Sequence, residues 1–410
     1  MQLMNGIGAM TKRIIAGQFH VADTELSTFN IGDILAKLEA AQKLAGLNRL
    51  LLLPSHSKAV TDAIIRFCRE RGIELYLWYK VSMDNDIQPE HGELTVSAWG
   101  SRGKGETGQW KKMFDTEENF RFACPRNKRY NQLLLNRCGD SLERYDGLFL
   151  DYTGFPLPSL GLEAIFTCFC RSCVEAEPRL LEWKRRVHDY RNFIPTATDQ
   201  DLERWGTFMG TAEEFDLLPF SAFRKESITL LAARYEKLAR GMGKGFGIDV
   251  LCPALAPFAG HDLAALGKLA DWIKPRIYCN VYGPSSIPLE FNRLAAAIRS
   301  WGGNYSTAAL MKYIERSIGI KMPKNMLQLP QIHFPPETIV SEVSKTVAAV
   351  SVPVHPSVEC APHPEYESTI DDVSVRNSAA SAKSCQGAVL AWNFLFAPDP
   401  FLRIVGETLS

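Results

Sequence analysis

The sequence alternates short apolar runs with longer segments of helical periodicity, and this alternation restricts the fold more than any other feature of the chain. In segment 31–45, for example, Ile34, Leu38 and Ala41 fall at helical spacing and Gly46 follows as a typical helix stop. The runs expected to form strands are 13–19, 50–54, 73–81, 146–151, 246–252, 272–280, 352–359 and 387–394. The segments expected to form helices are 31–45, 60–71, 126–137, 223–242, 263–270, 289–301, 373–382 and 401–409. Eight strand–helix units predict an α/β protein with a (β/α)8 TIM barrel.

The main alternative, an open doubly wound sheet, would carry a Gly-rich phosphate loop after its first strand. Gly17-Gln18-Phe19-His20 is not such a loop. The chain has no internal repeat and no low-complexity linker, which favours a single domain over residues 1–410. Long insertions are expected at about 82–122, 157–218 and 303–350, the last as loop with an extra helix. Loops of this length on a barrel usually build its site.

Charge and hydropathy narrow the possible partners. Lys and Arg total 46, and so do Asp and Glu, so no net field attracts nucleic acid or an anionic membrane surface. No apolar run approaches the roughly 18 residues that span a bilayer, and residues 1–11 lack a signal-peptide pattern. We therefore expect a cytoplasmic protein without a nucleic-acid or membrane partner, and homo-oligomerisation stays open.

Four of the ten cysteines form a pattern typical of a metal site. Cys168, Cys170 and Cys173 follow the fourth strand, and Cys124 lies at the end of the loop that leaves the third. Loops after neighbouring barrel strands meet at the same end, and four thiolates suit tetrahedral Zn²⁺ with no position left for water. The prediction is a structural zinc site, although free cysteines can also be small buried hydrophobes and the spacing fits an iron–sulfur radical site poorly.

An acidic residue ends the fourth strand. Leu148, Phe149 and Leu150 are continuously apolar, as in a strand buried on both faces, and Asp151 follows them directly. A carboxylate inside that core would cost several kcal/mol unless it opened onto a polar cleft, and the C-terminal ends of barrel strands form that cleft. Asp151 is therefore the first candidate for chemistry.

These motifs together resemble a known group of enzymes. The CPRNKRY run at 124–130, the strand ending in Asp151 and the CxCxxC motif are similar to the zinc-bearing β-galactosidases of glycoside hydrolase family 42. They resemble still more the uncharacterised glycoside-hydrolase-like barrels with a GI-x-LD-x-x-R-F/Y-P fourth strand and a D-x-I-K-P-M-x-Y sixth strand. The resemblance covers about residues 120–282 and implies a (β/α)8 hydrolase acting on a carbohydrate. Leu150-Asp151 replaces the Asn-Glu pair of family 42, Arg276 replaces Met and Gly154 replaces Arg.

Glycoside cleavage requires two carboxyl groups, one to protonate the leaving oxygen and one to attack or to activate water. Glu359, which ends the seventh strand, is the first choice of partner for Asp151. By analogy with the layout of strands four and seven, Asp151 is assigned as general acid/base and Glu359 as nucleophile. The reverse assignment makes Asp151 the nucleophile and needs an acid from strand five or six, for which Asp249 is the candidate.

A saccharide site also needs aromatic platforms and polar partners for hydroxyl groups. The candidates lie near strand ends and are Tyr152, His20, Asp249, Tyr278, Tyr282, Trp392 and Asn393, with Trp78 and Tyr79 as further possibilities.

Two other functions remain open. One is a barrel that binds saccharide without cleaving it. The other is a metal-dependent hydrolase of another bond, which would draw on His261, Asp262, His355, His363 and Glu365.

Overall fold

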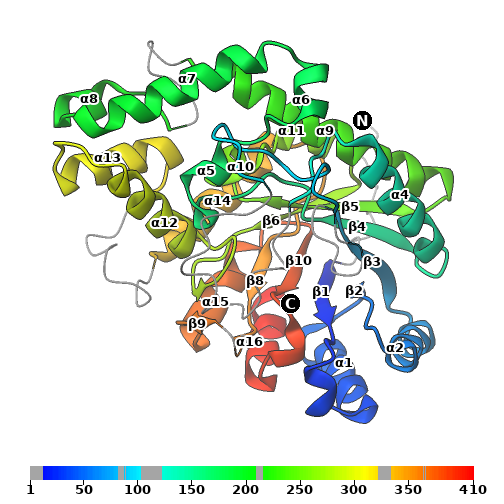
Figure 1. Cartoon of the computed structure of the whole chain (residues 1–410). Coiled ribbons are helices and arrows are strands. Elements are labelled where there is room, and N and C mark those ends of the chain that lie inside the picture. The colour runs from blue at the N-terminus through cyan, green and yellow to red at the C-terminus, as the bar shows by residue number, and fades with distance from the viewer. Residues whose placement is uncertain are drawn as a thin grey trace, which may run out of the picture.

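Eight parallel strands form the centre of the molecule (Figure 1). The computed structural model describes residues 13–81, 87, 89–102, 122–208, 216–321, 334–362, 364 and 366–410. The strands are β1 (Ile14–His20), β2 (Arg49–Leu53), β3 (Glu74–Lys80), β4 (Gly147–Asp151), β5 (Gly245–Leu251), β6 (Trp272–Arg276), β8 (Ser357–Glu359) and β10 (Gly387–Ala391). They are ordered β6-β5-β4-β3-β2-β1-β10-β8. The ring closes where Ile273 N donates to Pro353 O at 3.0 Å and His355 N donates to Ile273 O at 2.9 Å, so the predicted TIM barrel is confirmed.

Helices follow the strands and cover the outside of the barrel, as Figure 1 shows for α1, α2 and α16. The helices of the eight units are α1 (Ile31–Ala45), α2 (Lys58–Glu70), α4 (Lys128–Leu142), α9 (Leu218–Gly241), α11 (Leu263–Gly267), α12 (Ile287–Ser300), α15 (Asp372–Ser381) and α16 (Asp399–Leu409). Helix α1 begins in a capping box between Asn30 and Asp33 and ends at Gly46, whose φ of 78° is left-handed. The predicted stop at Gly46 is therefore confirmed.

The insertions carry helices of their own. After β4 come α5 (Leu162–Ile165), α6 (Arg171–Ala176), α7 (Leu180–Phe193) and α8 (Asp199–Arg204), and α10 (Ala256–Ala259) follows β5. The range 303–350, expected to hold loop and an extra helix, contains α13 (Thr307–Ile318) and α14 (Pro336–Ala349). Strands β7 (Val281–Tyr282) and β9 (Glu367–Ser368) pair as a short antiparallel ribbon. Most of the insertion at 82–122 lies outside the described residues, and the single-domain interpretation stays a prediction.

Aromatic rings fill the lower and middle barrel. Tyr76 on β3 faces Gly147 and Gly245 on the next two strands, where an added Cβ would lie only 2.3 Å from the Tyr76 ring atoms or hydroxyl. Trp272 likewise requires glycine at Gly247 and stacks on Phe149 with ring centroids 5.3 Å apart. The interior is thus a packed core, and space for a ligand is left at the C-terminal mouth.

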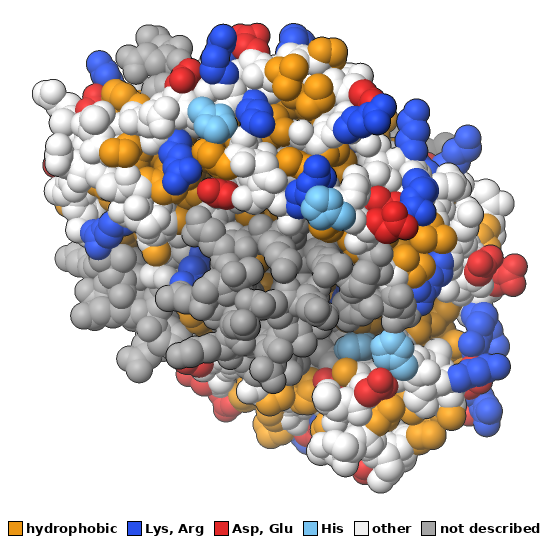
Figure 2. All heavy atoms as spheres, viewed as in Figure 1, with side chains coloured by type: hydrophobic (Ala, Val, Ile, Leu, Met, Phe, Trp, Pro, Cys, Tyr) orange, Lys and Arg blue, Asp and Glu red, His pale blue; other side chains and the backbone are white. Residues whose placement is uncertain are grey.

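The outer surface mixes charges of both signs. Figure 2 shows Lys and Arg side chains interspersed with Asp and Glu on the face viewed. Among the helices within the described ranges, none combines the length and the apolar character needed to cross a bilayer.

Candidate functional site

Four charged side chains meet at the mouth of the barrel, on three neighbouring strands. The register pairs Asp249 on β5 with Lys274 on β6, and Arg276 follows two residues later on the same face of β6. The Arg276 guanidinium contacts Asp151 through Nη2 and donates from Nε to Asp249 Oδ2 at 2.6 Å. Lys274 Nζ lies 3.3 Å from Asp249 Oδ1. Two carboxylates and two cations therefore form one nearly charge-balanced network.

Asp151 is held in place from several sides. Its side chain is 1% exposed, Trp78 Nε1 donates to Oδ2 at 2.7 Å and the backbone N–H of Tyr152 donates to Oδ1 at 2.5 Å. Contact with a guanidinium and two N–H donors stabilises the ionised form of a carboxyl group. Asp151 is thus fitted to act as a carboxylate rather than as a proton donor.

Burial affects the protonation of Asp249, which also contacts Arg276. Burial raises the pKa of Asp249 to about 7, although the nearby Lys274 ammonium acts against the shift. A carboxyl group with this pKa carries a proton for part of the time at neutral pH. Two adjacent carboxyl groups with different protonation are a common arrangement in acid–base chemistry.

A cavity of about 580 Å³, measured with its open mouth, lies beside this network. Of the predicted site residues, Tyr152 and Asp249 line it. Arg276, His261, Ser285 and Glu290 supply further polar groups, and most of the remaining wall is apolar.

His261 presents a fixed hydrogen-bond donor to the cavity. Its Nδ1 accepts from the backbone N–H of Leu251 at 3.0 Å, and Nε2 lies 3.5 Å from Thr153 Oγ1. Burial lowers the pKa of His261 to about 3, so the ring is neutral at ordinary pH. Because Nδ1 accepts a bond, the proton of the neutral ring is on Nε2.

Glu290, in contrast, accepts hydrogen bonds from two segments of the cavity wall. The backbone N–H and the hydroxyl of Ser159 each donate to its carboxyl group at 2.8 Å, and Ser285 N donates at 2.9 Å. Burial raises the pKa of Glu290 to about 7. Glu290 therefore links the loop after β4 to the segment that precedes α12.

Glu359 occupies a different environment from Asp151. Its carboxyl group is buried and accepts from Cys279 N at 2.8 Å, Asn280 N at 3.0 Å and Asn280 Nδ2 at 2.9 Å. Burial raises its pKa to about 7, although these N–H donors act against the shift. Glu359 is not among the described residues that line the cavity. Its role as a reacting group stays a prediction.

Replacing Glu359 separates the two roles that it could have. If it holds the turn after β6, Glu359→Gln should lower stability by about 1–3 kcal/mol, because an amide NH₂ then faces N–H donors. Thermal unfolding should show a lower midpoint, and activity measured well below that midpoint should be largely retained. Loss of activity with an unchanged unfolding midpoint would instead support the nucleophile assignment.

Two predicted aromatic platforms, Tyr278 and Trp392, belong to an aromatic stack that adjoins the charged network. Tyr278 and Tyr366 both stack on Trp392, with centroids 5.7 and 4.9 Å away, and the Tyr278 hydroxyl accepts from Lys274 Nζ at 2.9 Å. The hydroxyl of Tyr282 contacts Asn292 at 3.5 Å. Neither Tyr278, Tyr282 nor Trp392 is among the described residues of the cavity wall.

The remaining candidates have structural contacts. Asn393 accepts from His20 N at 3.2 Å and donates to His20 O at 2.8 Å, which ties the end of β1 to the end of β10. Tyr79 donates to Leu134 O at 2.8 Å, on the outer face of β3, whereas Trp78 contacts Asp151 as described above. Substrate binding by His20 and Asn393 stays a prediction.

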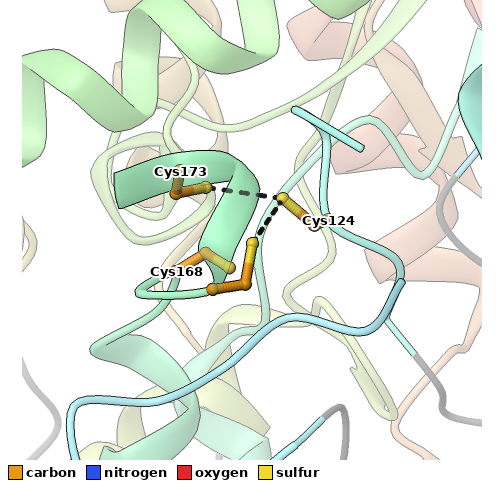
Figure 3. A group of neighbouring side chains, drawn as sticks. Cys124, Cys168 and Cys173 are labelled. Carbon is orange, nitrogen blue, oxygen red and sulfur yellow. Dashed lines mark hydrogen bonds between the residues drawn. The ribbon is translucent and has the colours of Figure 1, made fainter. Parts of the chain in front are cut away.

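The four predicted cysteine ligands form one buried cluster, with ligand atoms all within 4.8 Å of one another. Figure 3 shows the sulfur atoms of Cys124, Cys168 and Cys173 directed toward one another. Cys124 Sγ lies 3.4 Å from both Cys173 Sγ and Cys170 Sγ. Cys170 and Cys173 belong to the N-terminal part of α6 and Cys124 precedes α4, so the cluster joins two loops at one end of the barrel.

The cluster fits a tetrahedral metal ion. With metal–sulfur bonds of about 2.3 Å, the sulfur atoms would be about 3.8 Å apart, close to the spacing found here. Backbone N–H groups also point at the sulfurs, from Val96 to Cys168 at 3.3 Å and from Arg126 to Cys124 at 3.4 Å. Such donors stabilise thiolates, and four sulfur ligands leave no open position.

Sequence reasoning missed several groups of the site. Arg276 was noted only as a departure from related barrels, yet it contacts both carboxylates. Lys274 and Arg276 stand two residues apart in an otherwise apolar strand, and this spacing could have indicated two cations on one strand face. Glu290 gives no comparable signal. His363 and Glu365 lie outside the described residues.

Comparison with known proteins supports the fold. No family model matches the sequence. No curated protein matches it either. Solved structures with the same fold include a β-galactosidase from the psychrophilic Marinomonas ef1, with a TM-score of 0.55 and 8% identity over 96% of this chain. The chain spans 58% of that enzyme's length. The PgaB (BpsB) glycoside hydrolase domain from Bordetella bronchiseptica gives a TM-score of 0.54 and 11% identity over 97% of this chain and 99% of the domain. The expected likeness to glycoside hydrolase barrels is confirmed at the level of the fold.

Proposed function

We propose that the chain is a glycoside hydrolase, in which Asp151 is the nucleophile and Asp249 is the general acid/base. The observation that carries this proposal is the shared contact of both carboxyl groups with the Arg276 guanidinium at the barrel mouth. The named activities of the two barrels with the same fold, a β-galactosidase and a glycoside hydrolase domain, agree with a carbohydrate substrate. This choice takes the second of the two assignments that the sequence left open.

The proposed reaction has two steps. In the first step an Asp151 oxygen bonds to the anomeric carbon while the glycosidic C–O bond breaks. The electron pair of the breaking bond goes to the leaving oxygen, which takes the proton of Asp249. Asp249, now ionised, then removes a proton from water while the water oxygen bonds to the anomeric carbon and the bond to Asp151 breaks. Arg276 favours the ionised form of Asp151 before the attack and again once the sugar has left. A single guanidinium between both carboxyl groups favours the short separation of about 5–5.5 Å that retaining enzymes use.

The assignment of Asp151 as acid and Glu359 as nucleophile is less well supported. An acid must carry a proton. The Arg276 contact and two N–H donors favour the ionised form of Asp151, whereas burial raises the pKa of Asp249 to about 7 in spite of its contacts with Lys274 and Arg276. Glu359 accepts several hydrogen bonds from the segment after β6, which limits its freedom to attack. The Glu359→Gln experiment described above tests this assignment.

The pH dependence of activity follows from the protonation of Asp249. A general acid works in its protonated form, and the raised pKa of about 7 means that this form is lost as the pH rises through 7. We expect kcat/KM for a glycoside with a poor leaving group to fall above about pH 7, and Asp249→Asn to lower it roughly 10²- to 10⁴-fold.

The control for this prediction is the leaving group itself. Glycosides of acidic phenols need little protonation, so Asp249→Asn should affect the first step much less with them. Glu175→Gln, which replaces an exposed carboxylate, should change neither the pH dependence of activity nor its dependence on the leaving group. Equal losses with good and poor leaving groups would argue against Asp249 as the acid.

We further propose that the four cysteines hold Zn²⁺ as a structural ion. Bound zinc would fasten the loop before α4 to α6, and its four sulfur ligands leave no site for a reacting water. None of the ten cysteines, all of which lie in the described ranges, forms a disulfide.

A second candidate function is saccharide binding without cleavage. The observation that favours it is that Asp151 and Asp249 both already contact cations. Such a protein would bind sugars and turn over none of them. A metal-dependent hydrolase is less favoured, because the closed four-cysteine site is the one candidate metal cluster found within the described parts of the chain.

A further inference from the structure

We propose that the cavity beside Asp249 is a subsite for the leaving group of the substrate and that it takes an apolar group, such as the aryl or alkyl part of a glycoside, rather than a second sugar. This inference rests on the proposed function. It adds the chemical class of the substrate.

The position of the cavity relative to the two carboxyl groups assigns the leaving-group side. Asp249 and Arg276 line the cavity, and Asp151 is not among the described residues that do so. A general acid lies next to the oxygen that departs, whereas the nucleophile approaches from the opposite face of the sugar ring. A group bound in the cavity would therefore be attached to the departing oxygen.

The composition of the wall indicates an apolar occupant. Phe155, Leu157, Leu160, Val250 and Leu251 contribute buried aromatic and aliphatic side chains. A second sugar would bring several hydroxyl groups against this surface, and each one left without a partner would cost binding free energy. An aryl or alkyl group loses nothing there and gains contact area.

Many polar groups of the wall already have partners within the protein, as Arg276 has in Asp249 and in the hydroxyl of Ser285. Glu290 already accepts from Ser159 and Ser285. His261 Nε2–H is a fixed neutral donor, with Thr153 Oγ1 as a long contact at 3.5 Å. The Nε2–H donor of His261 suits an acceptor on the occupant, such as the oxygen of a substituted phenol.

Gly154 allows two loops that line the cavity to pack closely together. A Cβ at this position would lie 2.8 Å from Ala259 Cβ and 3.2 Å from His261 Nε2. Glycine therefore lets the loop after β4 approach the loop after β5 without a side chain entering the cavity that both loops line. This gives a physical reason for the glycine that departs from the pattern of related barrels.

The test compares inert ligands that share one sugar. Phenyl, methyl and glycosyl 1-thioglycosides of a panel of common hexoses and pentoses are titrated into the full chain by calorimetry. We expect the phenyl compound to bind at least about 10-fold tighter than the methyl compound, because a buried ring removes a large apolar area from water. The thiodisaccharide should bind no tighter than the methyl compound.

Leu160→Asn serves as the local variant, and Leu181→Asn, at a position 61% exposed, serves as its control. Leu160→Asn should reduce the preference for phenyl over methyl several-fold and leave the methyl affinity unchanged, and Leu181→Asn should change neither.

Three results would overturn the proposal. They are a thiodisaccharide that binds as tightly as the phenyl compound, a phenyl preference that Leu160→Asn does not change, and no binding of any thioglycoside. Since these ligands are not cleaved, a phenyl preference without any hydrolysis of O-glycosides would refute the proposed function and leave the subsite standing. Hydrolysis of O-glycosides together with tighter binding of the thiodisaccharide would support the proposed function and refute the apolar subsite.

Discussion

Asp151→Asn is expected to abolish hydrolysis of every glycoside that the wild-type protein cleaves, with kcat lower by roughly 10⁴-fold. The amide cannot attack the anomeric carbon, and its loss of charge removes the carboxylate that Arg276 holds in place. Steady-state rates with aryl glycosides measure the effect. A nucleophile is needed whatever group leaves, so the loss should be as large for good leaving groups as for poor ones. This distinguishes Asp151 from an acid, whose loss matters little for good leaving groups.

The control for this variant is the state of the fold. Asp151→Asn keeps the shape of the side chain and its oxygen for Trp78 Nε1, so far-ultraviolet circular dichroism and metal content should match those of the wild type. Asp399→Asn, which breaks an exposed ion pair with Lys37, should leave kcat unchanged. Substantial activity in a folded Asp151→Asn protein would exclude Asp151 as the nucleophile.

Loss of the metal is expected to have the second large effect. The purified protein should contain one Zn²⁺ per chain, and Cys173→Ser should remove most of it. The three remaining buried sulfurs would then lack the metal ion between them, and we expect the unfolding midpoint to fall by on the order of 10 °C. Elemental analysis and thermal unfolding measure both quantities.

The matched control is a cysteine outside the cluster. Cys385 is also buried but lies in the segment before β10, away from the other four thiols, and Cys385→Ser should retain the metal and most of the stability. A protein without stoichiometric metal, or equal destabilisation by both serine variants, would contradict the structural zinc site.

Much of the architecture could be predicted from the sequence, because the barrel depends on local patterns. Apolar runs, helical periodicity and stops such as Gly46 are read from neighbouring residues, and each of the eight expected strands overlaps a strand of the barrel. The four cysteines could also be predicted, since CxCxxC is a local motif and strand order fixes which loop lies beside it.

The partners of the carboxyl groups could not be predicted in the same way. Whether Asp151 meets Arg276 or Glu359 depends on side-chain reach across the mouth, which strand order does not determine. Glu359 ends its strand as expected, but its hydrogen bonds come from the turn at residues 279–280, whose backbone direction has no sequence signal. The need for glycine at 147, 245 and 247 likewise depends on long-range packing, because only the rings of Tyr76 and Trp272 leave no room for a Cβ there.

If Asp151 and Asp249 act as a pair on one glycosidic bond, a crystal structure with a bound phenyl 1-thioglycoside will show both side chains beside that bond. We expect the anomeric carbon to face an Asp151 oxygen, the sulfur to lie against the Asp249 carboxyl group and the phenyl ring to enter the cavity lined by Leu160 and His261. A sugar bound against Glu359, with neither aspartate in contact with the anomeric carbon or the sulfur, would contradict this pairing.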